Sequence, residues 1–267
     1  MKIKVYGCRG SISSATVVHT RYGSNTSCIT VEVDGQTLVL DAGSGIKQLE
    51  AERKNEDFTP DILLSHLHLD HIIGLTTFDP VLNPNRGARI FTFERGPLPL
   101  REQIFGAFKP PYWPVSIESA TSALCLPMYP EKCFSVGAFD VLPFVAMHSD
   151  ITASFHVTSG SKTLVHLLDN ELTLMDKDAY AALVYYCRGA DLVIFDASYL
   201  PGHYKPRIGW GHSTIKEAVK LQEDSGCKQI LLAHFDSSYS DEELDSLKQY
   251  PGGEHFLLAN EGAVILI

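Results

Sequence analysis

The sequence predicts a layered α/β fold in which strands and helices alternate along one chain. Short apolar runs recur from Ile3–Tyr6 to Gln229–Ala233, and polar segments with helix-capping signals separate them. Several runs stop at a histidine or an aspartate, as expected where strand ends line a ligand site. The length of 267 residues suits a large layered fold, and no repeat or linker divides the chain. We therefore expect one domain over residues 1–267.

The first half of the chain contains the clearest turn signal. Ser27–Val33 and Gln36–Leu40 flank Asp34-Gly35, which is a strong signal for a β-hairpin. Asp41 follows the second hairpin strand, where we expect it to bind neighbouring backbone amides rather than a metal ion. The other predicted strands of this half are Ile3–Tyr6, Asp61–Ser65 and Arg89–Phe93. Helices are expected from about Ile72 and over Leu100–Phe108.

The second half alternates apolar strands with capped helices. Two capping boxes, Thr214-Ile-Lys-Glu217 and Ser240-Asp-Glu-Glu243, open predicted helices that end at Gly226 and at about Tyr250. A further helix is predicted over Asp176–Arg188. The predicted strands of this half are Phe139–Met147, Lys162–Leu168, Leu192–Phe195 and Gln229–Ala233.

Composition limits the classes of partner and compartment. With 45% hydrophobic and 20% charged residues, the chain is typical of a globular protein without a membrane span or a signal peptide. Its six cysteines form no Cys-x-x-Cys pair, so we expect a reduced, cytoplasmic setting. The net charge of −10 and the lack of a basic stripe disfavour binding of extended nucleic acid. A small phosphorylated substrate remains compatible, because metal ions bring their own positive charge.

The most informative motif is His66-Leu-His68-Leu-Asp70-His71, in which four of six side chains can bind a metal ion. The motif lies between a predicted strand and an apolar stretch that can open a helix. At such a turn, His66 and His68 would hold one ion and Asp70 and His71 a second. Imidazole and carboxylate suit zinc, and also manganese or iron. A histidine-rich loop without a metal is the alternative, and the dense spacing disfavours it.

Polar side chains also follow other predicted strands. His148, Asp169, Asp196 and His234 each stand at the end of an apolar run. Because ligands sit beyond strand ends in layered α/β folds, we expect these residues to converge on the cleft that contains the histidine motif. Any one of them alone would more simply be a hydrogen-bonded core or surface residue.

His212 lies in a different setting, the glycine-flanked loop Gly209-Trp-Gly-His-Ser213 just before a helix. Such a loop can bring a proton donor to a substrate, although a capping histidine is the alternative. For five other histidines we expect only packing or surface positions: His19, His156, His166, His203 and His255.

Taken in order, these residues resemble the metallo-β-lactamase superfamily over nearly the whole chain. The matching parts are Asp41-Ala-Gly43, the His66–His71 motif, His148, Asp169 and His234. Among its branches, the chain is most similar to compact phosphodiesterases of the tRNase Z-like group, particularly cyclic-nucleotide phosphodiesterases of the anti-Pycsar type. The supporting segments are Tyr22-Gly-Ser-Asn-Thr-Ser-Cys28, Lys109-Pro-Pro-Tyr-Trp-Pro114, Leu168-Asp-Asn-Glu171, Phe195-Asp-Ala-Ser-Tyr199 and Gly209-Trp-Gly-His-Ser-Thr214.

The resemblance implies a four-layer αββα sandwich, a homodimer, and two divalent ions at one edge of the fold, expected to be zinc with manganese as the alternative. It assigns His66, His68 and His148 to one ion, Asp70, His71 and His234 to the other, and Asp169 as a bridge. His212 matches the catalytic histidine of the phosphodiesterase branch, and Asp196 the carboxylate that orients it. Asp70 is expected to be both a metal ligand and a catalytic residue.

The implied site favours phosphodiester hydrolysis. Two divalent ions lower the pKa of a bridging water, so a metal-bridged hydroxide can attack at physiological pH. The leaving oxygen needs a proton, which His212 can donate if Asp196 holds its ring. Hydrolysis of amides or lactones does not need this added pair. We therefore expect hydrolysis of a cyclic nucleotide or a similar small phosphodiester.

Two other activities remain as alternatives. The first is tRNA 3′-processing or another nuclease, which the acidic charge and the lack of a long basic arm between His148 and Asp169 disfavour. The second is a thioesterase or lactonase. For Tyr112 and Trp113, in a proline-rich loop, we weigh contact with a substrate base against packing or a subunit contact.

Overall fold

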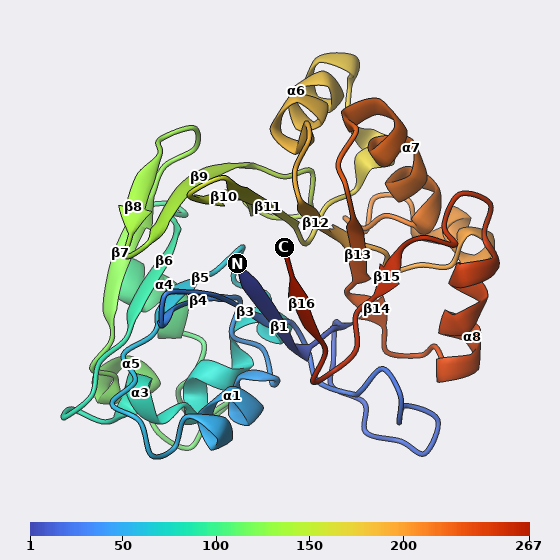
Figure 1. Cartoon of the computed structure of the whole chain (residues 1–267). Coiled ribbons are helices and arrows are strands. Elements are labelled where there is room, and N and C mark those ends of the chain that lie inside the picture. The colour runs from blue at the N-terminus through green and yellow to red at the C-terminus, as the bar shows by residue number, and fades with distance from the viewer.

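The computed structural model describes residues 1–267 and contains two stacked β-sheets with helices on their outer faces (Figure 1). This arrangement confirms the predicted four-layer αββα sandwich. The first sheet has the strand order β16-β1-β3-β4-β5-β6-β7. Its strands are β1 (Lys2–Gly7), β3 (Cys28–Val33), β4 (Gln36–Leu40), β5 (Asp61–Leu63), β6 (Arg89–Phe93), β7 (Leu124–Met128) and β16 (Val264–Leu266).

The second sheet has the order β15-β13-β12-β11-β10-β9-β8 and comes from the second half of the chain. Its strands are β8 (Phe134–Val136), β9 (Phe139–Val145), β10 (Ala153–Ser159), β11 (Lys162–Leu167), β12 (Leu192–Asp196), β13 (Ile230–Ala233) and β15 (Leu257–Leu258). Two short strands, β2 (Arg9–Gly10) and β14 (Phe235–Asp236), pair separately.

Helices cover the outer face of each sheet (Figure 1). Those beside the first sheet are α1 (Ile46–Glu52), α2 (Leu69–Ile72), α3 (Asp79–Leu82), α4 (Leu100–Phe105) and α5 (Ile117–Ala120). Those beside the second sheet are α6 (Lys177–Cys187), α7 (Ile215–Ser225) and α8 (Asp241–Asp245). No helix is both long and apolar enough to span a membrane.

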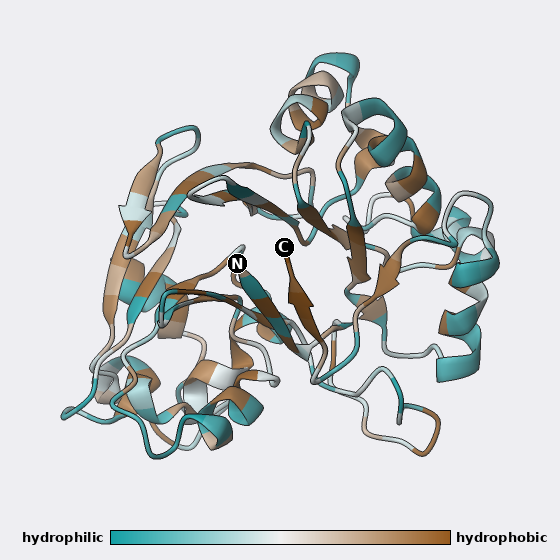
Figure 2. Ribbon diagram, in the orientation of Figure 1, coloured by the Kyte–Doolittle hydropathy of each residue, from teal (hydrophilic) through white to brown (hydrophobic).

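Alternating strand residues divide the interior into two apolar clusters. In β3, Ile29 and Val31 point into the cluster between the sheets, whereas Cys28 joins the cluster beneath the first group of helices. Figure 2 shows mostly apolar strands in the centre of the molecule and polar residues on the outer faces of the helices. Burial of these alternating residues is the main force that holds the layers together.

The parallel strands position the site. β4, β5 and β6 run parallel in the first sheet, and β11, β12 and β13 in the second. The residues that follow their carboxyl ends therefore gather along one edge of the sandwich. Asp41 follows β4, Ser65 and His66 follow β5, Asp169 follows β11, and His234 follows β13.

Several predicted helices are shorter than expected. α4 ends at Phe105 because Gly106 caps it and the Phe108 N–H donates to the Phe105 carbonyl in a tighter turn. The motif helix α2 begins earlier than Ile72 and makes a single turn before a 3₁₀ segment at Ile73–Thr77. α8 likewise ends at Asp245 and continues as a 3₁₀ turn over Ser246–Gln249, so only its beginning was predicted correctly.

Candidate metal centre

The histidine motif forms the turn between β5 and α2. His66 and His71 are fully buried, Asp70 is nearly so, and His68 is half-buried at the amino end of the helix. The extended backbone of His68 separates the strand end from the helical turn, so the four side chains diverge. This local geometry lets one short segment contribute to two neighbouring groups of ligand atoms.

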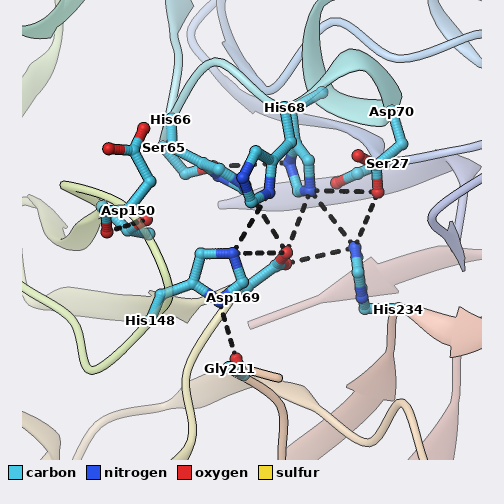
Figure 3. Close-up of polar contacts among 12 residues, drawn as sticks. Ser27, Ser65, His66, His68, Asp70, His148, Asp150, Asp169, Gly211 and His234 are labelled. Atoms are coloured by element: carbon cyan, nitrogen blue, oxygen red, sulfur yellow. Dashed lines mark hydrogen bonds and ion pairs between the residues drawn. The ribbon is translucent and has the colours of Figure 1, made fainter. Parts of the chain in front are cut away.

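The structure brings the seven predicted ligands together from both sheets (Figure 3). One group consists of His66, His68, His148 and Asp169, and the other of Asp70, His71, Asp169 and His234. Within each group, one donor atom per residue lies within 4.8 Å of every other. Asp169 belongs to both groups. Metal binding by these residues stays a prediction, and the arrangement agrees with the division expected for two ions.

The donor atoms fit divalent cations better than they fit one another. His68 Nδ1 lies 3.2 Å from His148 Nε2, and His71 Nε2 lies 3.2 Å from His234 Nε2. Two ring nitrogens that face each other can share at most one proton, and otherwise their lone pairs repel. The buried Nε2 of His66 has no hydrogen-bond partner at all. A cation in each group would satisfy these nitrogens together with the Asp169 carboxylate.

A second layer of hydrogen bonds orients the rings. The Asp41 carboxylate accepts from the Ser65 backbone N–H at 2.8 Å and from the His71 ring Nδ1 at 2.8 Å. The Ser65 hydroxyl lies 2.9 Å from the same carboxylate and 3.0 Å from His66 Nδ1. These contacts occupy the Nδ1 atoms and leave both Nε2 atoms facing the centre, which is the usual role of such partners at metal sites. Asp41 thus acts as expected.

His148 and Asp70 are held by backbone groups. The Nδ1 of His148 donates to the Gly211 carbonyl at 2.8 Å, which leaves Nε2 toward the other ligands (Figure 3). The backbone N–H of Ser11 donates to Asp70 at 2.7 Å. Residues from distant parts of the chain therefore fix the orientation of two predicted ligands.

Burial and neighbouring charges shift the pKa values of the candidate ligands in different directions. Burial, reinforced by the charge of His71, holds the pKa of His66 well below its ordinary value, so this imidazole is neutral. Burial would raise the pKa of Asp169, but His234 and His71 hold it well below its ordinary value. Burial would lower the pKa of His71, but Asp169, Asp41 and Asp70 raise it well above its ordinary value, so a cation would have to displace a proton from this ring.

His212 and Asp196 form a hydrogen-bonded pair beside the ligand groups. His212 Nδ1 donates to Asp196 Oδ2 at 2.8 Å. Burial alone would lower the pKa of His212, but the negative charges of Asp196 and Asp169 raise it to about 9. Asp196 also accepts from the backbone N–H groups of Asn170 and Ser198. The pair can therefore present a protonated imidazole at neutral pH.

His212 and Asp196 also lie close enough to Asp169 and His234 to form a third potential ligand group. Their mutual hydrogen bond already uses His212 Nδ1, the atom that faces the carboxylates. Proton donation by His212, with Asp196 as the acceptor that orients its ring, therefore fits this pair better than metal binding.

Tyr112 and Trp113 lie outside the ligand groups. The ring of Trp113 packs edge-on against Phe108, with centroids 6.0 Å apart, and joins the cluster beneath the first sheet. Tyr112 is 85% exposed. The packing alternative therefore describes Trp113, whereas the contact of Tyr112 with a substrate stays a prediction.

Three residues near the site received no role from the sequence. Ser65 orients His66, and Glu171 binds the loop that carries His212. His166 is fully buried, with its Nε2 3.9 Å from the Asp41 carboxylate. Ser65 adjoins the histidine motif, and Glu171 lies in the segment Leu168-Asp-Asn-Glu171, so proximity was the available signal. For His166, predicted only to pack, the sequence contains no such signal.

Comparison with known proteins places the chain in a family. A family model described as a beta-lactamase superfamily domain matches residues 36–235, a range that contains all seven candidate ligands. Ribonuclease Z of Bradyrhizobium sp. (strain ORS 278) is 24% identical over 262 residues, covering 80% of this chain and 85% of that protein. Ribonuclease Z of Archaeoglobus fulgidus is 22% identical over 283 residues, covering 90% and 88%.

Solved structures agree on the fold. The metallo-beta-lactamase fold protein YhfI from Bacillus subtilis has a TM-score of 0.75 at 18% identity, covering 99% of this chain and 98% of that one. Human tRNase Z, short form, has a TM-score of 0.69 at 20% identity, covering 100% and 99%. The chain therefore belongs to the beta-lactamase superfamily and is a metal-dependent hydrolase with the metallo-β-lactamase fold.

Proposed function

We propose that the protein hydrolyses small phosphodiesters, with cyclic nucleotides as the expected substrate class. The observation that carries this proposal is the buried His212–Asp196 pair directly beside the two ligand groups. Hydrolysis of a phosphodiester releases an alkoxide, which must gain a proton as it leaves. A protonated imidazole at this position supplies that proton.

The side chains have distinct roles in this proposal. His66, His68, His148 and Asp169 would hold one divalent cation, and Asp70, His71, His234 and Asp169 the other. When bound, such a pair supplies a water of lowered pKa and positive charge for the phosphate oxygens. The donor set suits zinc, with manganese as the alternative.

His212 acts as the general acid. Its Nδ1 is committed to Asp196, so the proton on Nε2 is the one available to the leaving oxygen. Asp196 keeps this orientation because two backbone N–H groups fix its own carboxylate. A carboxylate held in this way favours the imidazolium form and the correct ring orientation.

The shape and charge of the molecule favour a small substrate. The segment between His148 and Asp169 is only the β10–β11 hairpin, which pairs within the second sheet. The net charge of −10 adds repulsion toward a long polyanion. Both features support a cyclic nucleotide or a similarly small phosphodiester over a folded RNA.

A second candidate is processing of the tRNA 3′ end. Relatives named ribonuclease Z match this chain over about four-fifths of its length, and their name denotes action on RNA. The same ligand groups and the same acid would serve this reaction. The two candidates therefore differ in how the substrate is gripped and not in the chemistry.

One panel of assays with a variant tests the proposal. Purified protein of known metal content is offered 2′,3′- and 3′,5′-cyclic nucleotides, linear dinucleotides, a labelled pre-tRNA and a thioester. We expect turnover of cyclic nucleotides, and H212A should retain both metal ions while kcat falls by about 10²–10⁴-fold. Full kcat in H212A on every phosphodiester would refute the acid role. Cleavage of pre-tRNA with cyclic nucleotides untouched would select the second candidate.

Two controls complete the panel. D169A should lose metal, because it removes the carboxylate common to both groups, and elemental analysis measures this loss. Turnover of the thioester alone would replace phosphodiester hydrolysis by acyl hydrolysis. The homodimer implied by the family stays a prediction, which light scattering of the purified protein tests.

A further inference from the structure

We propose that Glu171 is a positioning residue that fixes residues 209–212, so that one loop orients both a metal-facing histidine and the proton donor. This inference deepens the proposed function and depends on it for the role of His212. It concerns a buried carboxylate that the hydrolytic chemistry itself does not use.

Glu171 is 1% exposed and is held by three neutral donors. Its Oε1 accepts from the backbone N–H of Gly209 at 2.8 Å and from the hydroxyl of Tyr204 at 2.6 Å. Its Oε2 accepts from the backbone N–H of Gly211 at 2.7 Å. A buried carboxylate with this many donors is strongly bound, and replacing one of its oxygens by an amide nitrogen leaves a backbone N–H without its acceptor. Glu171 therefore clamps the loop at two points that flank Trp210.

The clamped loop touches His148. The Gly211 carbonyl accepts from His148 Nδ1 at 2.8 Å, so the position of this peptide selects Nε2 as the nitrogen that faces the ligand group. The fit is close, because a Cβ on Gly211 would lie 2.0 Å from His148 Nδ1. A shift of the loop would therefore turn a predicted metal ligand.

The same loop carries His212, the residue that follows Gly211. Beyond it, the Ser213 hydroxyl donates to the Asn170 carbonyl at 2.6 Å and accepts from the Leu172 N–H at 3.0 Å. The loop is thus bound along residues 170–172, immediately after Asp169. One segment of chain supplies the carboxylate shared by both ligand groups and the anchor of the acid-bearing loop.

These contacts have a joint consequence. Loosening the loop should weaken metal retention through His148 and proton donation through His212 together, even though Glu171 touches neither ring. Substitution of a residue with a purely structural role would lower thermal stability without lowering both metal affinity and proton donation.

Glu171→Gln tests the inference, because it keeps the shape of the side chain and removes one acceptor. We expect its affinity for Zn²⁺, measured by chelator competition, to fall about 10–100-fold. On a cyclic nucleotide, whose leaving group is an alkoxide that needs a proton, kcat should fall over the same range with KM little changed. In the metal-free protein, amide hydrogen exchange at Gly209 and Gly211 should become faster. Tyr204→Phe removes only the hydroxyl donor and should shift all three readouts in the same direction by less.

Glu261→Gln is the matched control. Glu261 also accepts two backbone N–H bonds, from Ser24 and Asn25 at 2.6 Å each, but it binds a different loop. If Glu171→Gln matches Glu261→Gln in Zn²⁺ affinity and in exchange at Gly209 and Gly211, the inference is overturned. If Glu171→Gln does not fold, Tyr204→Phe decides by the same comparison. A wild type inactive on every phosphodiester would refute the proposed function, whereas affinity and amide exchange would still test the clamp.

Discussion

His71 donates its Nδ1 proton to Asp41, and this hydrogen bond determines which ring nitrogen faces the centre. Asp41→Asn should weaken metal binding about 10–100-fold, because the amide cannot accept equally from His71 and Ser65. Asparagine tolerates the left-handed backbone at this position, where φ is 59°. The loss measured by Zn²⁺ titration would then reflect the side chain and not backbone strain.

Asp191→Asn provides the control for this prediction. Asp191 is also buried and accepts from the Thr163 N–H at 2.9 Å, but it precedes β12 and so lies at the opposite end of the strand from the site. Its variant should bind metal like the wild type. Equal affinities for the two variants would show that Asp41 does not support the centre.

Gly211 and Gly209 lie in the same loop but differ in their distance from His148. Both have a positive φ, 90° and 88°, so alanine strains the backbone similarly at either position. Only at Gly211 would the new Cβ meet His148, because nothing lies within 4 Å of a Cβ at Gly209. Gly211→Ala should therefore bind Zn²⁺ more weakly than Gly209→Ala in a titration. Equal losses would mean that backbone strain alone is responsible.

The donors that hold Glu171 illustrate what the sequence can and cannot predict about a site. Polar residues at the ends of apolar strands predicted the convergence of His148, Asp169 and His234, because strand direction carries that information. Two of the three partners of Glu171 are backbone N–H groups in a loop whose path is set by tertiary packing. A pattern of side chains in the sequence cannot predict where such backbone groups lie. The same is true of the Gly211 carbonyl that orients His148.

The first residue of α8, Asp241, binds the loop between β2 and β3 to the helix. Its carboxylate accepts from the backbone N–H groups of Thr20 and Arg21 at 2.8 and 2.7 Å, and it lies 3.4 Å from the buried guanidinium of Arg9. Burial would raise the pKa of Asp241, but these donors lower it below its ordinary value. The ionised form is therefore the one that stabilises the fold.

The stability that Asp241 contributes to the fold therefore depends on pH. A lowered pKa in the folded state contributes stability above the unfolded pKa of about 3.9, and this contribution is lost as the pH falls through the folded value. Asp241→Asn should lower the free energy of unfolding at pH 7 by about 3–5 kcal/mol, since Arg9 then lies buried without its counter-charge. Urea unfolding should show the gap between variant and wild type closing only below about pH 4. A gap that does not depend on pH would exclude this role.

Element boundaries were harder to predict than element identity. The capping box at Ser240 correctly predicted where α8 begins, because its hydrogen bonds join residues only three positions apart in the sequence. The end of α8 depends on how Leu244 and Leu247 pack, and the chain tightens into a 3₁₀ turn there. β7 was missed because it contains Pro127 and lies at the edge of the first sheet.

For the whole molecule, ions in the candidate centre would couple binding to folding. Ligands at 100 times their dissociation constant stabilise a fold by about 2.7 kcal/mol, which corresponds to roughly 5–10 °C in Tm for a chain of this size. Removing metal with EDTA should lower Tm by that amount in a calorimetric scan. D169A should show no response to EDTA, and a wild type that is equally insensitive would contradict metal binding at this site.

Apart from β16, the first sheet comes from the first half of the chain and the second sheet from the second half, and this division has a practical consequence. Each ligand group draws on both sides of the exposed turn at residues 129–133, with the His66–His71 motif on one side and His148, Asp169 and His234 on the other. The Glu131 N–H donates to the Pro143 carbonyl, so a cut between Pro130 and Glu131 leaves that bond within one piece. Fragments 1–130 and 131–267 should then reassemble more tightly when Zn²⁺ is added, which would turn the hydrolase into a two-piece reporter of free metal.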